Sequence, residues 1–356
     1  MTIRPLEISL DISPEYRFDV IDITKKISDL FNGSRDNYRK TTYCSFHTTA
    51  GFLDQNLSSR LNHQKEKIRS YITAFQQLFP INANYHHDVM ELRDELSEAQ
   101  RKVEPKNADS HLTFIGSGLR NCVTYRNTPD VPVFFIELDG VTEYGNRTRQ
   151  MNAMFYNNEE IVFKQKVSVP VSRHPIDSVN LRDSKLGYLE KLNDILSKYE
   201  IENGRIDISL DPSERFAGLT VNEYETLLMT YDLVQILKNP VKFMGEKGKY
   251  LLQHPRKIPT RTKEYAKYDF VQIFNELMDS FGMTQSVFEK LLARVIALPA
   301  EKFLSMKRQI SFLVSNKGND DTAKIVQGRY QSPILVQWKE SLNASRLLNI
   351  TVTRYK

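Results

Sequence analysis

The chain has 356 residues, of which 40% are hydrophobic and 26% charged, and its formal net charge is +5. This length exceeds one small core and favours two domains, and the composition is that of a globular protein rather than a disordered or fibrous one. No apolar run is long enough to span a bilayer, and the first residues lack the apolar core of a signal peptide. We therefore expect no membrane association and a cytoplasmic location. The two cysteines, Cys44 and Cys122, are too few for a disulfide framework.

Charge is divided unevenly along the chain. Residues 1–160 carry a net charge of −3, whereas residues 161–356 carry +8. The apolar pattern also changes in this region, from alternation with period two to helical spacing. We therefore predict an α+β domain over residues 1–170, followed over residues 171–356 by a mainly α-helical domain that ends in strand-like segments.

The first part of the chain alternates strands and helices without a regular strand–helix–strand rhythm, which is typical of an α+β fold rather than a doubly wound sheet. A helix is expected over residues 57–79, where apolar residues share one face and Pro80 follows. Strands are expected at residues 6–12, 17–24, 41–46, 112–115, 122–125, 131–138 and 162–171.

The second part is dominated by helical spacing. A helix is expected over residues 184–199, and Thr220 and Glu223 have the spacing of a capping box that would start another. Further helices are expected at residues 270–281, 284–298 and 299–314, and strands at 334–338 and 347–355. The sequence contains no recognisable internal repeat.

Three histidines of the first part are candidates for a metal site. His47 ends the expected strand 41–46, and His87 and His111 lie in polar stretches further along the chain. Three neutral imidazoles with an open fourth position are typical of catalytic zinc. His86 is the alternative to His87, because neighbouring residues on a strand point to opposite faces. These histidines could equally be ordinary polar residues at the ends of strands and loops.

A basic stretch at residues 238–267 contains nine lysines and arginines against two acids, with tyrosines interleaved. Such a stretch could neutralise the phosphates of a nucleic acid or a nucleotide. It could also be a solvated loop of a basic protein. The basic residues are Lys238, Lys242, Lys247, Lys249, Arg256, Lys257, Arg261, Lys263 and Lys267.

Residues 1–160 resemble the YjbQ family, which is described as a family of secondary thiamine-phosphate synthases. The resemblance starts at the segment 18–24 and sharpens at three short stretches that occur in the family's order. These stretches are His47-Thr48-Thr49-Ala50, Tyr85-His86-His87-Asp88 and Asn107-Ala108-Asp109-Ser110-His111. No family is recognised in the second half.

The resemblance implies a compact α+β domain that forms homotrimers and holds a metal or an anion at a histidine cluster. On this pattern His47, His87 and His111 match the family's histidines, and Arg149 matches an arginine near its last strand. The sequence departs from the family at Gln55, where a glutamate is expected, and at residues 131–135, where a tryptophan–glutamine pair is expected.

Two functions are compatible with these features. The first is a zinc-assisted enzyme, or one using another divalent metal, that acts on a phosphorylated small molecule, either as a thiamine-phosphate synthase-like transferase or as a metal-dependent hydrolase. Asp88 or Asp109 would then orient a ligand or act as general base, and Arg149 would clamp the phosphate. The second is a non-catalytic oligomeric scaffold whose basic half binds nucleic acid or a protein partner.

Overall fold

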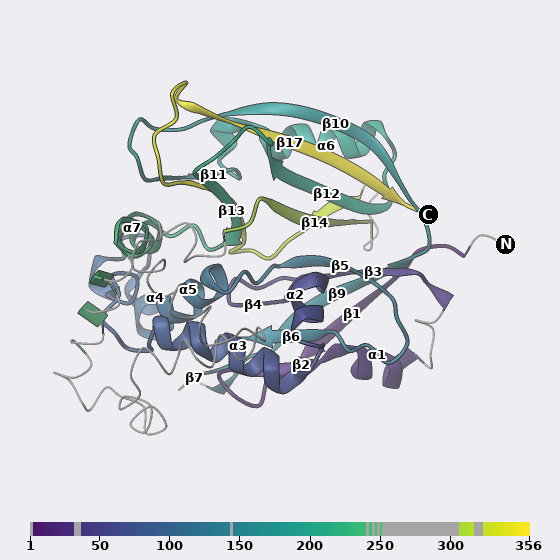
Figure 1. Cartoon of the computed structure of the whole chain (residues 1–356), viewed down its shortest axis with the longest axis horizontal. Helices are drawn as coiled ribbons and strands as arrows, with labels where there is room; N and C mark the ends of the chain where they lie inside the picture. Colours follow the sequence, from purple (N-terminus) through teal and green to yellow (C-terminus); the bar gives the residue numbers. More distant parts are fainter. Residues whose placement is uncertain are drawn as a thin grey trace, which may run out of the picture.

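The computed structural model describes residues 3–31, 37–142, 145–239, 242–243, 246–247, 250, 306–316 and 323–356. These residues form two lobes that lie one above the other (Figure 1). The first lobe runs from β1 to β9, residues 6–156, and the second from β10 to β17, residues 159–355. Each lobe combines sheets with helices, so the α+β class is confirmed. No helix of the described part is long and apolar enough to cross a membrane.

The first lobe encloses a core between two sheets, filled by residues such as Ile12, Phe52 and Phe135. The four-stranded sheet has the order β1 (Leu6–Ile12), β9 (Arg149–Tyr156), β3 (Lys40–Ser45) and β5 (Cys122–Arg126). The three-stranded sheet has the order β2 (Asp19–Asp22), β6 (Phe134–Glu137) and β4 (Ala50–Gly51). A short hairpin of β7 (Val141–Thr142) and β8 (Gly145–Asn146) follows β6.

The helices of this lobe place α5 in the interior. They are α1 (Ile23–Phe31), α2 (Gln55–Arg60), α3 (Lys65–Leu78), the 3₁₀ helix η2 (Met90–Leu92), α4 (Glu98–Val103) and α5 (Ala108–Gly116). The strand expected at residues 112–115 is therefore wrong. Every residue of α5 is buried, and a short apolar run fits a buried helix as well as a strand. The helix expected over residues 57–79 is interrupted at Asn62 and His63, which adopt positive φ.

The second lobe repeats this plan with its own sheets. The five-stranded sheet has the order β10 (Glu159–Pro170), β17 (Ser345–Tyr355), β12 (Asn203–Leu210), β14 (Gln309–Ser315) and β15 (Lys324–Val326). The three-stranded sheet has the order β11 (Asp177–Asn180), β16 (Ser332–Gln337) and β13 (Ala217–Asn222). Its described helices are η3 (Ser184–Leu186), α6 (Tyr188–Lys198), the π-helix η4 (Leu228–Asp232) and α7 (Leu233–Lys238).

The mainly helical character expected for residues 171–356 is not what the described residues form. The helix expected over 184–199 corresponds to α6, but the stretch read as a capping box ends β13, and residues 309–315 form β14. Both strands are continuous buried runs, in which strand and helix periodicities cannot be separated. The helices expected over 270–298 lie outside the described residues. The lobes meet at residues 157–158 rather than at 170, because β10 pairs with β17.

The two lobes share one strand topology, although the sequence shows no repeat. The order β1-β9-β3-β5 of the first lobe corresponds to β10-β17-β12-β14 of the second, and β2-β6-β4 corresponds to β11-β16-β13. A helix follows the second strand in both lobes, α1 in one and α6 in the other. The fold is therefore a tandem duplication at the level of structure.

Strand register identifies equivalent residues of the two lobes. Arg149 pairs with Ile12 at the end of β1, and Arg346 pairs with Val169 near the end of β10. Glu137 is the last residue of β6, and Gln337 is the last residue of β16. The Arg149 guanidinium forms an ion pair with Glu137, whereas Arg346 Nε donates to Gln337 Oε1 at 3.2 Å. The same contact thus occurs in both lobes, with a carboxylate replaced by an amide in the second.

The four-stranded and five-stranded sheets face each other (Figure 1). Between them lies a small core cluster that contains Cys44, Cys122 and Leu313. The rings of Tyr156 and Tyr355 stack with centroids 3.7 Å apart, and the Tyr355 hydroxyl lies 2.7 Å from Thr42 Oγ1. Tyr355 is 4% exposed, so this last residue of β17 joins the lobes.

We expect Tyr355→Ala to lower the free energy of unfolding by about 3–5 kcal/mol, because it opens a cavity in the contact between the lobes. Tyr355→Phe should cost about 1 kcal/mol, since it removes one buried hydrogen bond and keeps the ring. Urea unfolding measures both changes. Tyr330→Ala, at a side chain that is 62% exposed, is the matched control, with a change within about 0.5 kcal/mol. Equal effects at positions 330 and 355 would contradict the proposed role of the ring.

Candidate metal centre

Helix α5 carries the first of two histidines that meet in the interior. Its amino end is held by Asp88, whose Oδ1 accepts a hydrogen bond from the backbone N–H of Ala108 at 3.0 Å. The hydroxyl of Ser110 donates to the carbonyl of Leu138 at 2.9 Å. One turn into the helix, His111 points to the end of β13 in the second lobe.

The His111 ring is oriented by Asn222, the last residue of β13. His111 Nδ1 lies 2.7 Å from Asn222 Oδ1, while Asn222 Nδ2 donates to the carbonyl of Thr48 at 3.1 Å. Because an amide oxygen only accepts, Nδ1 carries the proton and Nε2 keeps its lone pair. Burial lowers the pKa of His111 to about 3, with a further contribution from the nearby His87. His111 is therefore a neutral imidazole whose Nε2 carries a lone pair.

His87 lies in the loop before η2 and is completely buried. Its backbone N–H donates to Asp232 Oδ2 at 3.0 Å, which ties the loop to η4. Its Nδ1 lies 2.9 Å from Glu225 Oε2, and its Nε2 lies 3.3 Å from Asn107 Oδ1. Burial alone would lower the pKa of His87, but the hydrogen bond to Glu225 and the neighbouring carboxylates raise it.

Glu223 completes a cluster of metal-binding groups. The ligand atoms of His87, His111 and Glu223 all lie within 4.8 Å of one another, and we call these three residues the donor cluster. The two imidazole rings are T-shaped, with centroids 5.2 Å apart. Glu223 Oε2 lies 3.5 Å from His111 Nε2, and its Oε1 contacts the buried Arg93 guanidinium at 3.4 Å. The cluster thus combines residues of both lobes.

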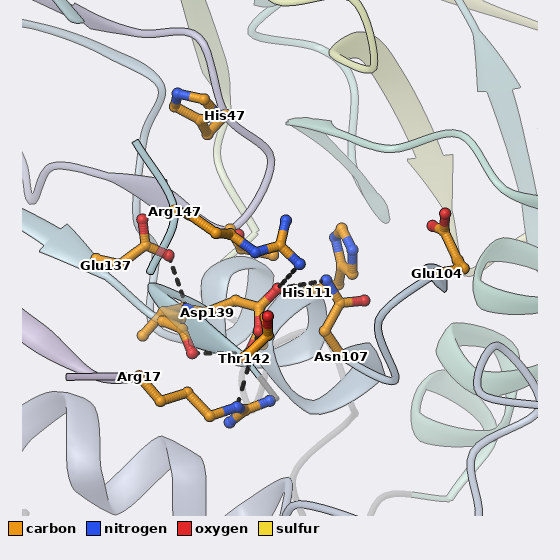
Figure 2. Close-up of polar contacts among 12 residues, drawn as sticks. Arg17, His47, Glu104, Asn107, His111, Glu137, Asp139, Thr142 and Arg147 are labelled. Atoms are coloured by element: carbon orange, nitrogen blue, oxygen red, sulfur yellow. Dashed lines mark hydrogen bonds and ion pairs between the residues drawn. The ribbon is translucent and has the colours of Figure 1, made fainter. Parts of the chain in front are cut away.

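Asp139 links the donor cluster to two arginines (Figure 2). Asn107 Nδ2 donates to Asp139 Oδ2 at 2.8 Å, and Arg147 Nη2 contacts the same oxygen at 3.0 Å. Arg17 Nε lies 3.8 Å from Asp139 Oδ1. The side chains of Arg147 and Arg17 are 30% and 27% exposed, so positive charge reaches solvent beside a buried polar network.

The sequence-predicted His47 is not part of the donor cluster. Its ring lies on the far side of Arg147 from His111 (Figure 2). His47 Nε2 accepts a hydrogen bond from the backbone N–H of Gln150 at 2.8 Å, and Nδ1 lies 3.4 Å from Arg149 Nη1. Because Nε2 accepts, Nδ1 of the neutral ring carries the proton, and neither nitrogen is left with a lone pair for an ion. His86, the alternative to His87, stacks on Tyr231 with centroids 5.0 Å apart and also lies outside the cluster.

Arg149 is buried, and its guanidinium is engaged by other groups of the protein. Besides its ion pair with Glu137, its Nη2 donates to the carbonyl of Asp139 at 3.0 Å and to Thr49 Oγ1 at 3.3 Å. Burial raises the pKa of Glu137, and the charge of Arg149 opposes this shift. The phosphate-clamping role expected of Arg149 therefore fits Arg147 and Arg17 better, since both reach solvent.

The two predicted aspartates also have structural partners. Asp109 forms a two-pronged ion pair with Arg17, with distances of 2.8 and 2.9 Å. Asp88 holds the amino end of α5, and burial raises its pKa to about 7, with nearby His87 opposing the shift. Asp109 thus positions Arg17, whereas Asp88 lies next to His87 in the chain and has one oxygen, Oδ1, engaged by α5.

The contribution of the second lobe was not predicted from the sequence. Glu223 was interpreted as the last residue of a capping box, and Asn222 and Glu225 received no role. Glu225 is in fact the helix cap, because its carboxylate accepts from the backbone N–H groups of Leu227 and Leu228 at 2.7 Å. The available signal was a run of polar residues immediately after an apolar stretch, which is typical of a strand end that faces a site. Most of the basic stretch 238–267 lies outside the described residues.

Comparisons with known proteins give structural neighbours of the YjbQ family. A YbjQ-like protein of unknown function from Sulfolobus solfataricus P2 is 16% identical, with a TM-score of 0.29, and the match covers 55% of this chain and 99% of that chain. A hypothetical protein from Aeropyrum pernix K1 is 12% identical, with a TM-score of 0.29 and coverages of 54% and 98%. An uncharacterized conserved protein of the YjbQ/UPF0047 family from Clostridium acetobutylicum is 12% identical, with a TM-score of 0.28 and coverages of 53% and 98%.

The family named by these neighbours is the one that the first half was predicted to resemble. No protein-family model and no curated protein matches the chain.

We expect His47 to make stability depend on pH. Burial, with the charges of Arg149 and Arg147, lowers its pKa to about 3, against about 6.5 in an unfolded chain. Between these two pKa values the folded state binds fewer protons than the unfolded chain does. The contribution of His47 to the free energy of unfolding is therefore complete above pH 6.5 and decreases as the pH is lowered. The slope is at most about 1.4 kcal/mol per pH unit.

His47→Gln should remove this part of the pH dependence, which urea unfolding at pH 7 and pH 5 measures. His174→Gln, at an exposed loop position, is the matched control and should keep the slope of the wild type. An unchanged slope in His47→Gln would show that His47 titrates as freely in the folded as in the unfolded chain.

Proposed function

We propose that this protein is a metal-dependent enzyme acting on a phosphorylated small molecule, with zinc or another divalent metal held by His87, His111 and Glu223. The observation that carries the proposal is the donor cluster, whose three ligand atoms lie within 4.8 Å of one another. Two imidazoles and one carboxylate are a ligand set used by catalytic zinc sites.

The contacts behind the donors support this assignment. His111 Nδ1 is engaged by Asn222 and His87 Nδ1 by Glu225, so Nε2 is the atom that each ring would offer to an ion. An ion bound to His87 Nε2 would replace its contact with Asn107 Oδ1. A histidine ligand that donates its other ring N–H to a carboxylate or an amide is the usual arrangement in metal sites. Glu223 directs one oxygen to His111 and the other to Arg93. Types and orientation of the donors thus fit a divalent metal.

When bound, such a metal would polarise a phosphoryl or carbonyl oxygen or lower the pKa of a bound water. The remaining work falls to the protein's own residues. Arg147 and Arg17 offer partly exposed guanidinium groups that can hold a phosphate in place. Asp139 fixes Arg147 and also orients Asn107, whose amide oxygen faces His87. Asp88, in the same loop as His87, is the candidate to move a proton.

This proposal includes both reactions considered from the sequence, which are transfer resembling thiamine-phosphate synthesis and hydrolysis of a phosphate ester. Both require an anionic substrate beside a polarising centre. The homotrimer implied by the family resemblance stays a prediction, which light scattering of the purified protein can test.

Calorimetric titration of the metal-stripped protein with zinc tests the ligand set. We expect saturable binding to the wild type, its loss in His87→Ala and His111→Ala, and a weakening of 10-fold or more in Glu223→Gln. His174→Ala is the control and should bind as the wild type does. Thermal unfolding of each variant without metal separates lost ligation from lost folding.

His47→Ala distinguishes two ligand sets. Zinc binding should be retained in this variant if the donor cluster is the site, because His47 lies outside the cluster and its Nε2 lone pair is engaged by the backbone N–H of Gln150. Loss of binding in His47→Ala with retention in Glu223→Gln would overturn the proposed set in favour of three histidines.

Arg147→Ala tests the anionic substrate. We expect weaker binding of inorganic phosphate to the zinc-loaded protein, by about 10-fold, because one charge-assisted contact is lost. Zinc affinity itself should change little, since Arg147 reaches the donor cluster only through Asp139 and Asn107. Arg182→Ala, at an exposed position of the second lobe, is the control. Equal phosphate affinity in wild type and Arg147→Ala would exclude the assigned role.

A further inference from the structure

A cavity of about 350 Å³ lies between the two lobes and away from the donor cluster. Its volume is in the range of small-molecule sites. The first lobe contributes side chains of β1 and β9, and the second contributes the end of β14, β15 and the residue that follows it. The polar lining of the cavity includes Glu7, Asp11, Asn152, Ser315, Lys324 and Gln327.

The alternation of β1 explains why this lining is polar. Ile8, Leu10 and Ile12 are buried in the core of the first lobe. Glu7, Ser9 and Asp11 therefore lie on the opposite face of the strand, which is the face turned to the second lobe. Two carboxylates and one ammonium, that of Lys324, line the cavity, so its net charge is negative.

The Glu7 carboxylate of this lining already accepts hydrogen bonds from other residues of the protein. Glu7 Oε1 accepts from Asn152 Nδ2 at 2.5 Å, and Glu7 Oε2 accepts from the Ser315 hydroxyl. The bond to Ser315 joins the lobes, and the two bonds together leave Glu7 little capacity for a ligand. A strand rises about 3.3 Å per residue, so Asp11, four residues on, stands about 13 Å from Glu7 and takes no part in these bonds.

Two acceptors of the cavity have no partner in the described part of the chain. Gln327 Oε1 is a buried oxygen without a hydrogen bond among these residues. No hydrogen bond or ion pair of the Asp11 carboxylate occurs among them either. The oxygen of Gln327 is buried, and an unpaired buried acceptor is costly unless a ligand or a water satisfies it. The Asp11 carboxylate is exposed to solvent and contributes negative charge to the cavity.

We propose that this cavity binds a small organic cation, an ammonium or guanidinium compound, between the lobes. Asp11 supplies the counter-charge, and Gln327 accepts a hydrogen bond from the same ligand. Gln150 and Phe46 lie between the cavity and His47, so the ligand would be adjacent to the His47 loop without touching the donor cluster. This site is independent of the proposed metal-dependent activity.

Isothermal titration of the full-length protein with agmatine and with putrescine tests the proposal. We expect saturable binding of at least one of them, and no binding of ribose, which has a similar size but no charge. Asp11→Asn should weaken the binding by 10-fold or more, and Gln327→Leu by several-fold. The matched control is Asp194→Asn, which removes an exposed carboxylate on α6 and should leave the affinity unchanged.

Asp11 is exposed, so Asp11→Asn should fold, and its thermal unfolding midpoint verifies this. If it does not, Gln327→Leu carries the test alone. The proposal is overturned if neither cation binds the wild type, if ribose binds as well as the cations, or if Asp11→Asn and Asp194→Asn bind them alike.

Discussion

The packing of the two large sheets against each other determines the rest of this structure. The stacked rings of Tyr156 and Tyr355, with Cys44, Cys122 and Leu313 around them, form a contact in which each lobe covers the other. An exposed sheet face would leave apolar area in water, and the contact removes it. When the two sheets are packed together, the end of β13 lies beside α5. The donor cluster forms at this point.

A second constraint comes from the many charges that the lobes bury. A buried ion pair contributes little net stability compared with an apolar pair, but the loss of one partner costs several kcal/mol, because the other charge is left without compensation. Arg149 with Glu137 is a pair of this kind, and its geometry is fixed by the surrounding fold. Around Asp139, contacts with Asn107 and Arg147 place a polar network next to His87 and His111.

The sequence predicts one half of this site and misses the other for a physical reason. His87 and His111 stand out because histidine is scarce, with seven in the chain, and because they lie in stretches that resemble a known family. Asn222 is 111 residues from His111, and no local pattern indicates which distant segment will pack there. His47 was grouped with the other histidines because it ends an expected strand and because the family resemblance includes it. Its Nε2 instead accepts from the backbone N–H of Gln150 in β9.

The fold itself was predictable where polar and apolar residues alternate, as in β1, and less so where the chain is apolar throughout. β14 and α5 are both short buried runs, and each was assigned to the wrong kind of element. A buried segment carries no amphipathic period, since both of its faces meet the core. Tertiary contacts decide such cases, and these contacts involve residues far apart in the sequence.

The duplicated architecture has a consequence for how the donor cluster assembles. In an assembly of separate subunits, a centre built from two partners exists only above the concentration at which they associate. Here a short connection at residues 157–158 joins the lobes, so Glu223 meets the histidines at the high effective concentration of a tethered segment. The centre is therefore complete in every chain however dilute the protein is. If that connection were cleaved, the donor cluster would remain assembled only as long as the contact between the two sheets held the lobes together.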